Sequence, residues 1–332
     1  MKRWQKAVSV LGAVLVVGAG VLGYEYWKLQ PERQLAHEHP VLGETHAPSA
    51  STAPSTAPAE PGAAASAGGE TGGGQKQEEA ISSFTVLLLG LDGRDGDALT
   101  RSDVIMIAHV NPKQHAVHLV SIPRDTRVNL PSIGMTKINH AYVMAAVNGG
   151  DAAGKQAAIQ AVSDFMGVPV NYHVSMNFDG FERFVNEIGG VELTLPNDIG
   201  PIPAGPVHAG GELALDLVRE RYSLPGGETD RQANQAMVLK AIVQKLLTTE
   251  YVPKLPGLYQ QMRQDVLDTN FSEADLVSLA LLYKNTPGDA IEYRQIPGHA
   301  GAAFDPLLQM ELSYWIPKMS EVQEIAKVFL QD

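Results

Sequence analysis

The chain has 332 residues, a formal net charge of −12 at pH 7 and no cysteine. That length suits one large domain or two small ones. Because there is no cysteine, the sequence excludes disulfide bonds, thiolate metal sites and a cysteine nucleophile. The acidic total, with no basic stripe to offset it, argues against nucleic acid as a partner.

The N-terminus has the pattern of a membrane anchor. Basic residues are concentrated in 1–6, and the run 7–24 carries no charged side chain. Such a run is near the lower limit for a helix that crosses a bilayer. The positive flank predicts a cytoplasmic tail over 1–6, a transmembrane helix over 7–27 and an extracellular remainder. A cleaved signal peptide is the main alternative, although no clear cleavage site stands out.

Residues 28–80 are rich in Ala, Pro, Ser, Thr and Gly, and their apolar content is mostly alanine. Such a composition cannot build a hydrophobic core, so we predict a disordered spacer. The spacer would hold a domain over 81–332 away from the membrane while keeping it tethered.

Three short apolar runs open this domain. They cover Phe84–Gly90, Val104–Val110 and His115–Ile122, and each is bounded by residues that favour turns. This is the pattern of β-strands. Residues 111–114 form a connection of hairpin length, so the second and third strands should be antiparallel.

Charged residues stand at the ends of these strands. Asp92 follows the first strand, Arg101 and Asp103 precede the second, and Arg124 follows the third. The start of one antiparallel strand lies beside the end of its partner, so these side chains should meet at one rim if the first two strands also pair. Two carboxylates and two guanidiniums suit a divalent metal and a phosphate. The alternative is that the aspartates only serve the turns, where this residue is common.

The rest of the chain mixes helix and strand patterns, which predicts one α/β domain with a mixed sheet and helices on its faces. Strands are expected at 171–178, 191–195 and 291–296, and a loop at 197–208. Helices are expected up to 149–150, at 154–166, 179–188 and 212–218, after 230, up to 283 and near the C-terminus, with Asp179, Asp230, Ser272 and Ser320 as caps.

Further basic residues follow in the second half. Arg219 and Arg221 can share a face only in an extended segment, so the preceding helix should end near Val218. Arg231 would lie in the first turn of the next helix, with Gln235 one turn later on the same face. A helix N-terminus favours a bound anion, and the planar fork of arginine matches phosphate oxygens. The alternative is a set of surface salt bridges with the many acidic residues.

Taken together, these motifs resemble the LytR-CpsA-Psr family of Gram-positive envelope enzymes. The expected order of basic tail, membrane helix, spacer and extracellular domain is similar as well. The match runs from Phe84 to Leu247 and rests on FTVLLLGLD (84–92), TRSDVIMIAHVNP (100–112), SIPRDT (121–126), KINHAY (137–142), IGGVELTLP (188–196), LVRERY (217–222) and TDRQANQ (229–235).

The resemblance implies an α/β/α sandwich with a hydrophobic pocket for a polyprenyl chain, which residues 181–188 and 237–247 could wall unless they are ordinary core. It implies Mg²⁺, with Mn²⁺ as the alternative, on Asp92 and Asp103. The family usually has an arginine where this chain has Asn234, which removes one cationic contact. The implied pyrophosphate-binding residues are Arg101, Arg124, Arg219, Arg221, Arg231 and Gln235, with Arg101, Arg124 and Asp103 as the catalytic ones.

The reaction implied is the transfer of a glycan phosphate from an undecaprenyl-pyrophosphate-linked precursor to a peptidoglycan hydroxyl, with release of undecaprenyl phosphate. No dedicated base stands out. Asp125 and Asp230 are weak candidates, and His140 could touch substrate. The alternatives are a polyprenyl-pyrophosphate hydrolase and a non-catalytic wall-binding or regulatory protein.

Overall fold

The computed structural model describes residues 28–36, 38–43, 81–93, 100–264 and 266–331. The predicted tail, the predicted membrane helix and most of the predicted spacer lie outside these ranges. Among the described residues, no helix has both the length and the apolar character that crossing a bilayer requires.

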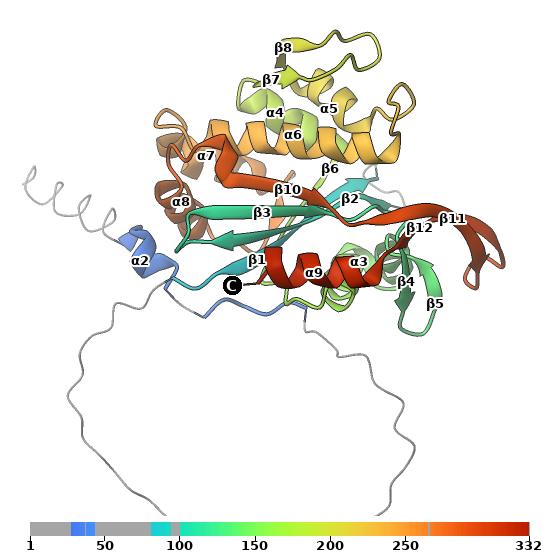
Figure 1. Cartoon of the computed structure of the whole chain (residues 1–332). Coiled ribbons are helices and arrows are strands. Elements are labelled where there is room, and N and C mark those ends of the chain that lie inside the picture. Colours follow the sequence, from blue (N-terminus) through green and yellow to red (C-terminus); the bar gives the residue numbers. More distant parts are fainter. Residues whose placement is uncertain (1–27, 37, 44–80, 94–99, 265, 332) are drawn as a thin grey trace, which may run out of the picture.

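A six-stranded mixed sheet forms the centre of the domain (Figure 1). The antiparallel hairpin predicted for the second and third strands is confirmed, and so is the pairing of the first strand with the second. The first strand is parallel to β6, and β10 is parallel to β3. The strands, in spatial order, are β10 (Ile291–Gln295), β3 (Ala116–Ser121), β2 (Arg101–Asn111), β1 (Phe84–Asp92), β6 (Tyr172–Asn177) and β9 (Asp268–Thr269).

Helices cover both faces of the sheet. Successive side chains of a strand point to opposite faces, and the central strands carry apolar side chains on both, so each face must be buried. Leu87 and Leu89 of β1 pack with α3 (His140–Met166) and α9 (Met319–Phe329). Val86 of the same strand faces a second cluster, which includes residues of α6 (Glu228–Leu246) and α8 (Glu273–Leu282). Figure 1 shows the resulting layers, with α6 above the sheet and α9 below it.

A smaller cluster completes the upper layer. It joins α4 (Phe178–Glu187), α5 (Gly211–Arg219) and part of α6 to the hairpin of β7 (Val191–Leu195) and β8 (Gly205–Ala209). The strand at 191–195 is confirmed, whereas β8 begins inside the predicted loop 197–208.

Several predicted helix ends are wrong. Asn177, not Asp179, caps α4, because its side chain accepts a hydrogen bond from the N–H of Gly180 at 2.7 Å. The long helix begins at Glu228, so Asp230 lies inside its first turn and instead accepts a hydrogen bond from the N–H of Gly226 at 2.7 Å.

Other predicted boundaries also need revision. The two helices expected around 149–154 form a single element, α3, with a break at Gly150, whose φ of +77° suits glycine. The cap predicted at Ser272 is confirmed, and the structure shows that Ser272 forms a capping box with Asp275. In contrast, α9 begins at Met319 and Ser320 does not cap it.

Within residues 84–331, β8, β9, four further strands and one α-helix were not predicted. The hairpin of β4 (Arg127–Leu130) and β5 (Gly134–Lys137) follows the rim residues directly. A second hairpin, β11 (Gly298–Asp305) with β12 (Met310–Pro317), extends from the sheet at the right of Figure 1. The unpredicted helix is α7 (Leu255–Met262).

The prediction of a disordered spacer that starts at residue 28 is wrong for residues 28–36 and 38–43, which pack against the domain. We call this segment the strap. It contains the short helix α2 (Pro31–Gln34), and Leu35 beside it is 1% exposed. The side chain of Gln34 donates to Asp275 of α8 at 2.9 Å, and Gly43 pairs with Val170. The strap is therefore part of the folded domain.

Candidate active site

The rim of the sheet takes its shape from an irregularity between β1 and β2. Gly90 lies opposite Val104, whereas Leu91 lies opposite Ser102, so Asp103 is the extra residue of a β-bulge. A Cβ on Gly90 would lie 2.8 Å from that of Val104, so the strands can approach this closely only at a glycine.

The predicted convergence of charged residues at this rim is confirmed. Asp92 and Asp103 line a polar cavity of about 260 Å³, which we call the arginine cavity. Phe178, Val218 and Tyr222 complete its wall. Its basic and amide side chains are Arg124, Arg219, Arg221, Arg231 and Gln235, all of them predicted from the sequence.

Arg124 lies at this rim and lines the arginine cavity. It lies in the turn after β3 and forms a hydrogen-bonded ion pair with the Oδ2 atom of Asp103. Burial opposes the charged guanidinium, but the Asp103 carboxylate outweighs burial and raises the pKa of Arg124 above its ordinary value. The guanidinium is therefore a permanent positive charge at the cavity.

The end of α5 aims two more arginines at the cavity. The helix ends at Arg219, and Glu220 already has extended backbone angles, close to the end predicted at Val218. Arg219 lies 5.0 Å from the ring centre of Phe178, and Arg221 donates a hydrogen bond to the hydroxyl of Tyr222 at 2.9 Å.

The first turns of α6 supply the remaining contacts. Arg231 is 6% exposed and bonds Glu228 at 2.6 Å, while its Nε atom has no hydrogen-bond partner among the described residues. Gln235 donates to the carbonyl of Val218 at 3.0 Å, so its carbonyl oxygen remains for another donor. Asn234 is buried and is not among the residues that line the arginine cavity.

The carboxylates of this cavity fit a divalent cation. Asp103 is 8% exposed, and its buried Oδ1 atom has no hydrogen-bond partner within the described part of the chain. Asp92 is exposed on the same cavity. No three acidic or imidazole side chains gather into a metal site in the described ranges. A pair of carboxylates suits Mg²⁺, which is commonly completed by substrate phosphates and water.

A second polar cavity, of about 270 Å³, adjoins the first, and we call it the histidine cavity. Arg124 and Arg221 line both cavities, whereas Arg101 lines only this one. Arg101 therefore shares the histidine cavity with Arg124 and Arg221 but does not line the arginine cavity. The remaining lining residues are Asp125, Lys137, Asn139, His140 and Ser313.

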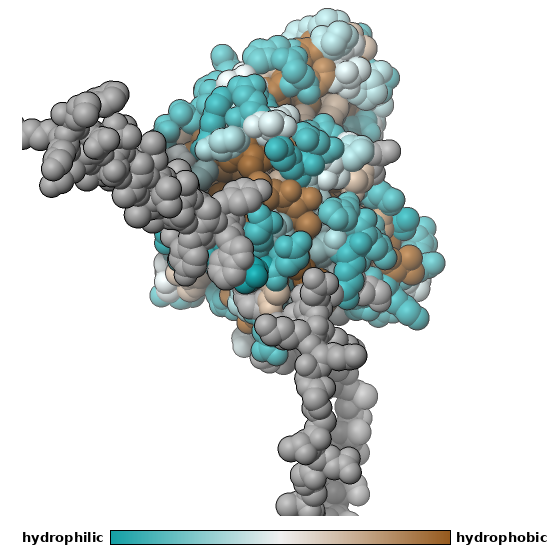
Figure 2. All heavy atoms as spheres, turned by 90° about the vertical axis from the view of Figure 1, so that its left-hand side faces the viewer, coloured by the Kyte–Doolittle hydropathy of each residue, from teal (hydrophilic) through white to brown (hydrophobic). Residues whose placement is uncertain are grey.

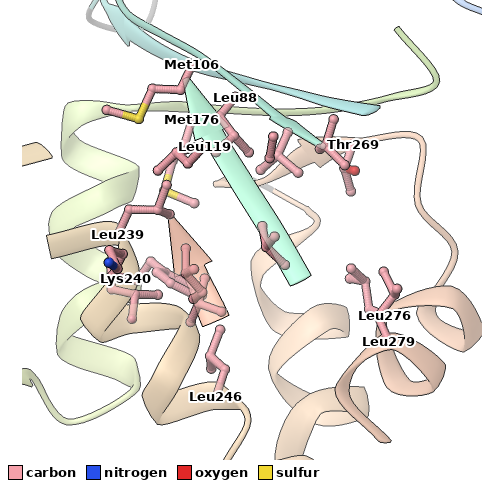
Figure 3. A pocket seen from close by; sticks show the side chains of 18 of the residues that line it. Leu88, Met106, Leu119, Met176, Leu239, Lys240, Leu246, Thr269, Leu276 and Leu279 are labelled. Carbon is pink, nitrogen blue, oxygen red and sulfur yellow. The ribbon is translucent and has the colours of Figure 1, made fainter. Parts of the chain in front are cut away.

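A third cavity, the apolar cavity, lies between the upper face of the sheet and the helices α4, α6, α7 and α8, with a volume of about 460 Å³. Leu88, Met106 and Leu119 contribute from the sheet, and Leu239 from α6 and Leu279 from α8 also line it (Figure 3). Figure 2 shows brown hydrophobic side chains set back between the teal outer parts of one face. The segments 181–188 and 237–247, predicted as walls of a groove, do line this cavity.

The apolar and arginine cavities share a wall. Phe178, Val218 and Gln235 line both of them. One elongated ligand can therefore place an apolar chain under α6 and an anionic group among the arginines.

Some lining residues could not be predicted as part of a site. Ser313 belongs to the unforeseen hairpin β11–β12, and Phe178 reads as the end of a strand. Lys137 and Asn139 lie in the KINHAY motif, which is where a sequence signal for them existed. Asp230 lines neither polar cavity, so the structure does not support it as a base.

The family model described as LytR_cpsA_psr matches residues 55–329. The chain belongs to the LytR-CpsA-Psr family. The expected resemblance is therefore confirmed over most of the sequence.

Individual relatives of this LytR-CpsA-Psr protein carry transferase names. It is 37% identical over 215 residues to "Polyisoprenyl-teichoic acid–peptidoglycan teichoic acid transferase TagU" of Enterococcus faecalis, covering 62% of this chain and 67% of the relative. It is 31% identical over 242 residues to the protein of the same name from Bacillus cereus, covering 71% and 75%. Among solved structures, "TagT bound to LIIa-WTA" has a TM-score of 0.59 and 28% identity, covering 74% of this chain and 89% of that one.

Proposed function

We propose that this protein is a phosphotransferase that moves a glycopolymer, carried on undecaprenyl pyrophosphate, to a hydroxyl of peptidoglycan and releases undecaprenyl phosphate. The observation that carries the proposal is the shared wall of the apolar and arginine cavities at Phe178, Val218 and Gln235. A polyprenyl pyrophosphate has the matching chemistry, with a long apolar chain ending in adjoining anionic phosphates. The relatives named as teichoic acid transferases support teichoic acid as the glycopolymer class.

The arginines would act on the pyrophosphate by position and charge. Phosphoryl transfer depends mostly on positioning and electrostatic stabilisation, and planar guanidiniums match phosphate oxygens. Arg124, fixed by Asp103, and Arg231, fixed by Glu228, are already oriented before substrate binds. Preorganised charges of this kind stabilise charge that develops on the leaving phosphate.

Mg²⁺ is proposed as the cofactor. Asp92 and the free Oδ1 atom of Asp103 would hold it, and when bound it would supply Lewis-acid stabilisation of phosphoryl oxygens. Mn²⁺ prefers similar oxygen ligands and is the alternative metal.

The proposed location is the outer face of a cell membrane, with a single helix over 7–27 as the anchor and the N-terminus in the cytoplasm. This rests on the basic residues of 1–6 and the uncharged run that follows them. An anchor of this kind would keep the domain beside a lipid-linked donor.

The test uses the full-length protein in membranes, a polyprenyl-pyrophosphate-linked glycan, Mg²⁺ and a peptidoglycan oligomer. Mass spectrometry follows polyprenyl phosphate release and covalent transfer, beside Arg124→Ala and, as a control, Arg263→Ala, which lies outside the three cavities. Each charge-assisted hydrogen bond contributes roughly 1.5–3 kcal/mol. We therefore expect Arg124→Ala to reduce transfer by at least about tenfold per bond lost, with Arg263→Ala unaffected.

Two outcomes would replace the proposal. Release of polyprenyl phosphate without transfer, at the same rate with and without peptidoglycan, would make the protein a hydrolase. Neither release nor transfer, despite confirmed donor binding, would make it a wall-binding or regulatory protein.

A further inference from the structure

The histidine cavity contains groups that the proposed donor does not use. This cavity meets the arginine cavity at Arg124 and Arg221, and it shares no lining residue with the apolar cavity. A ligand bound there would lie against the arginine-held phosphate without crossing the lipid chain. That is the position a second substrate needs.

His140 stands in this cavity at the start of α3, with a half-buried ring. Its Nδ1 atom lies 2.6 Å from the hydroxyl oxygen of Thr136, and that hydroxyl donates to the Oδ2 atom of Asp305 at 2.7 Å. The three residues come from α3, β5 and β11, so the arrangement joins both unpredicted hairpins to the cavity.

The protonation of this chain of hydrogen bonds follows from Asp305. Burial alone would raise its pKa, but hydrogen bonds from Tyr314, Thr136 and the N–H groups of Leu308 and Leu307 outweigh burial and lower it to about 2. Asp305 is therefore an ionised acceptor at neutral pH.

These hydrogen bonds allow only one neutral tautomer of His140. Thr136 has a single hydroxyl hydrogen, and Asp305 requires it. The hydroxyl oxygen of Thr136 must accept a hydrogen bond from Nδ1 of His140, so that nitrogen carries the proton. The Nε2 atom of the neutral ring is left with its lone pair, and it has no hydrogen-bond partner among the described residues.

We propose that the histidine cavity binds the acceptor, a sugar hydroxyl of the glycan, and that His140 is the general base that takes its proton. This rests on the proposed function and names the acceptor side of the same site. Thr136 and Asp305 are positioning residues, which hold the ring in the tautomer that a base requires.

The proton and bond changes balance without any further reagent. The acceptor O–H gives its proton to Nε2 of His140 while its oxygen forms a bond to the phosphorus that carries the glycan. The bond from that phosphorus to the bridging oxygen breaks, and the electron pair leaves on polyprenyl phosphate. The imidazolium then returns its proton to water or to the departing phosphate.

The charges around His140 favour its neutral form. Burial lowers its pKa below the ordinary value, Lys137 and Arg101 lower it further, and Asp305 and Asp125 oppose them. The other charged groups on the cavity are Arg124 and Arg221. A neutral imidazole at pH 7 is the form that accepts a proton.

Asp125 lines the same cavity but is already engaged. Its Oδ1 atom accepts a hydrogen bond from Nζ of Lys137 at 2.8 Å, so this oxygen is less available to a substrate hydroxyl than Nε2 of His140.

The experiment uses the full-length protein and the transfer assay described above, with donor binding measured separately for every variant. The variants are His140→Gln, Thr136→Val and Thr136→Ser, with His299→Gln as the matched control, because His299 is exposed on β11 and lines none of the three cavities. The readout is the rate of transfer from pH 5 to pH 9.

We expect His140→Gln to lower the transfer rate by about 10²- to 10⁴-fold, which is the usual contribution of general base catalysis to a rate. Donor binding should be unchanged. The acidic limb of the wild-type pH profile, with an apparent pKa below the ordinary histidine value, should disappear. Thr136→Val should lower the rate and move that limb, and Thr136→Ser, which keeps the hydroxyl, should restore both.

An unchanged acidic limb in His140→Gln, whatever its stability, would overturn the role of His140 while leaving the transferase proposal intact. Equal rates and profiles for Thr136→Val and Thr136→Ser would overturn the hydrogen-bonded positioning. A wild-type protein that transfers to no acceptor would overturn the proposed function itself, and this inference with it.

Discussion

The two carboxylate oxygens of the buried Asp103 have different hydrogen-bonding environments. Its Oδ2 atom pairs with Arg124, whereas its Oδ1 atom is buried without a hydrogen-bond partner in the described residues. An unpaired buried oxygen is costly, and a bound cation would relieve the cost. The exposed carboxylate of Asp92 lies on the same cavity and can share that cation.

Asp92→Asn should therefore weaken the binding of Mg²⁺ without disturbing the ion pair of Asp103 and Arg124. We expect the Mg²⁺ concentration for half-maximal transfer to rise by about tenfold or more, since an amide is a poorer ligand for a hard cation. Asp216→Asn, at an exposed position of α5, is the control. A Mg²⁺ requirement unchanged in Asp92→Asn would contradict the assignment of the metal to this pair.

Asp305 should make the free energy of unfolding depend on pH in the acidic range. Its folded pKa of about 2 lies below the ordinary value of 3.8, so its ionised form stabilises the fold by about 2 kcal/mol at neutral pH. That contribution is complete above about pH 4 and is lost as the pH falls through about 2.

Asp305→Asn should lower the free energy of unfolding by about 2 kcal/mol at pH 7, and the difference from the wild type should shrink between pH 4 and pH 2. Urea unfolding at several pH values measures it, with Glu311→Gln, exposed on β12, as the control. A difference that stays constant down to pH 2 would show that the carboxylate does not titrate with the low pKa.

At the scale of single residues, the charged part of the site could be predicted, whereas the apolar residues that join it to the apolar cavity could not. Asp92, Asp103 and Arg124 stand beside recognisable strand ends, so the pairing of antiparallel strands brings them together. Phe178 and Val218 are ordinary apolar residues whose role depends on how α4 and α5 pack, which no local pattern contains.

Among the elements, α6 does most to connect the arginine cavity with the apolar cavity. Its first turns carry Arg231 and Gln235 into the arginine cavity, and two turns further on Val243 and Leu246 line the apolar cavity. The helix rises about 1.5 Å per residue, so these groups are spread over roughly 20 Å. This is how one element can serve both ends of an amphiphilic ligand.

Elements with strong local patterns were predictable, whereas the hairpins β4–β5 and β11–β12 were not. The strands β1, β2 and β3 of the central sheet are rich in Val, Ile and Leu. In contrast, β11 contains mainly glycine and alanine, which are depleted in strands, and its partner is found only through the turn at 306–309. The helix α6 was predicted, but its start was misplaced because Asp230 resembles a cap.

The strap was missed because it was grouped with the Ala-, Pro- and Gly-rich segment that follows, although it contains three leucines of its own. A few contacts secure it. Leu35 is 1% exposed, and the carbonyl of Gly43 accepts a hydrogen bond from Ser163 of α3 at 3.0 Å. A Cβ at Gly43 would lie 2.9 Å from that of Ser163, so only glycine fits this close approach.

Leu35→Ala should release the strap. Truncating a buried leucine costs about 2–5 kcal/mol, so amide hydrogen exchange over 28–43 should accelerate strongly while the central sheet stays protected. Val41→Ala is the control, since Val41 is 55% exposed. Unchanged exchange in Leu35→Ala would mean that this contact does not hold the strap.

For the whole molecule, the arrangement of the cavities defines an order of substrates. The apolar cavity, the arginine cavity and the histidine cavity follow one another, and each neighbouring pair shares lining residues. A lipid chain, a pyrophosphate and an acceptor hydroxyl fit the three in that order. The strap packs against α8, which also lines the apolar cavity.

The most direct test of this account follows one phosphorus atom. The full-length protein is given a donor labelled with ³²P at the phosphate bonded to the glycan, together with Mg²⁺ and peptidoglycan, and the label is located after the reaction. We predict that the label is joined covalently to peptidoglycan together with the glycan, and that unlabelled polyprenyl phosphate is released. Label that stays on the lipid, or leaves as free glycan phosphate although peptidoglycan is present, would contradict it.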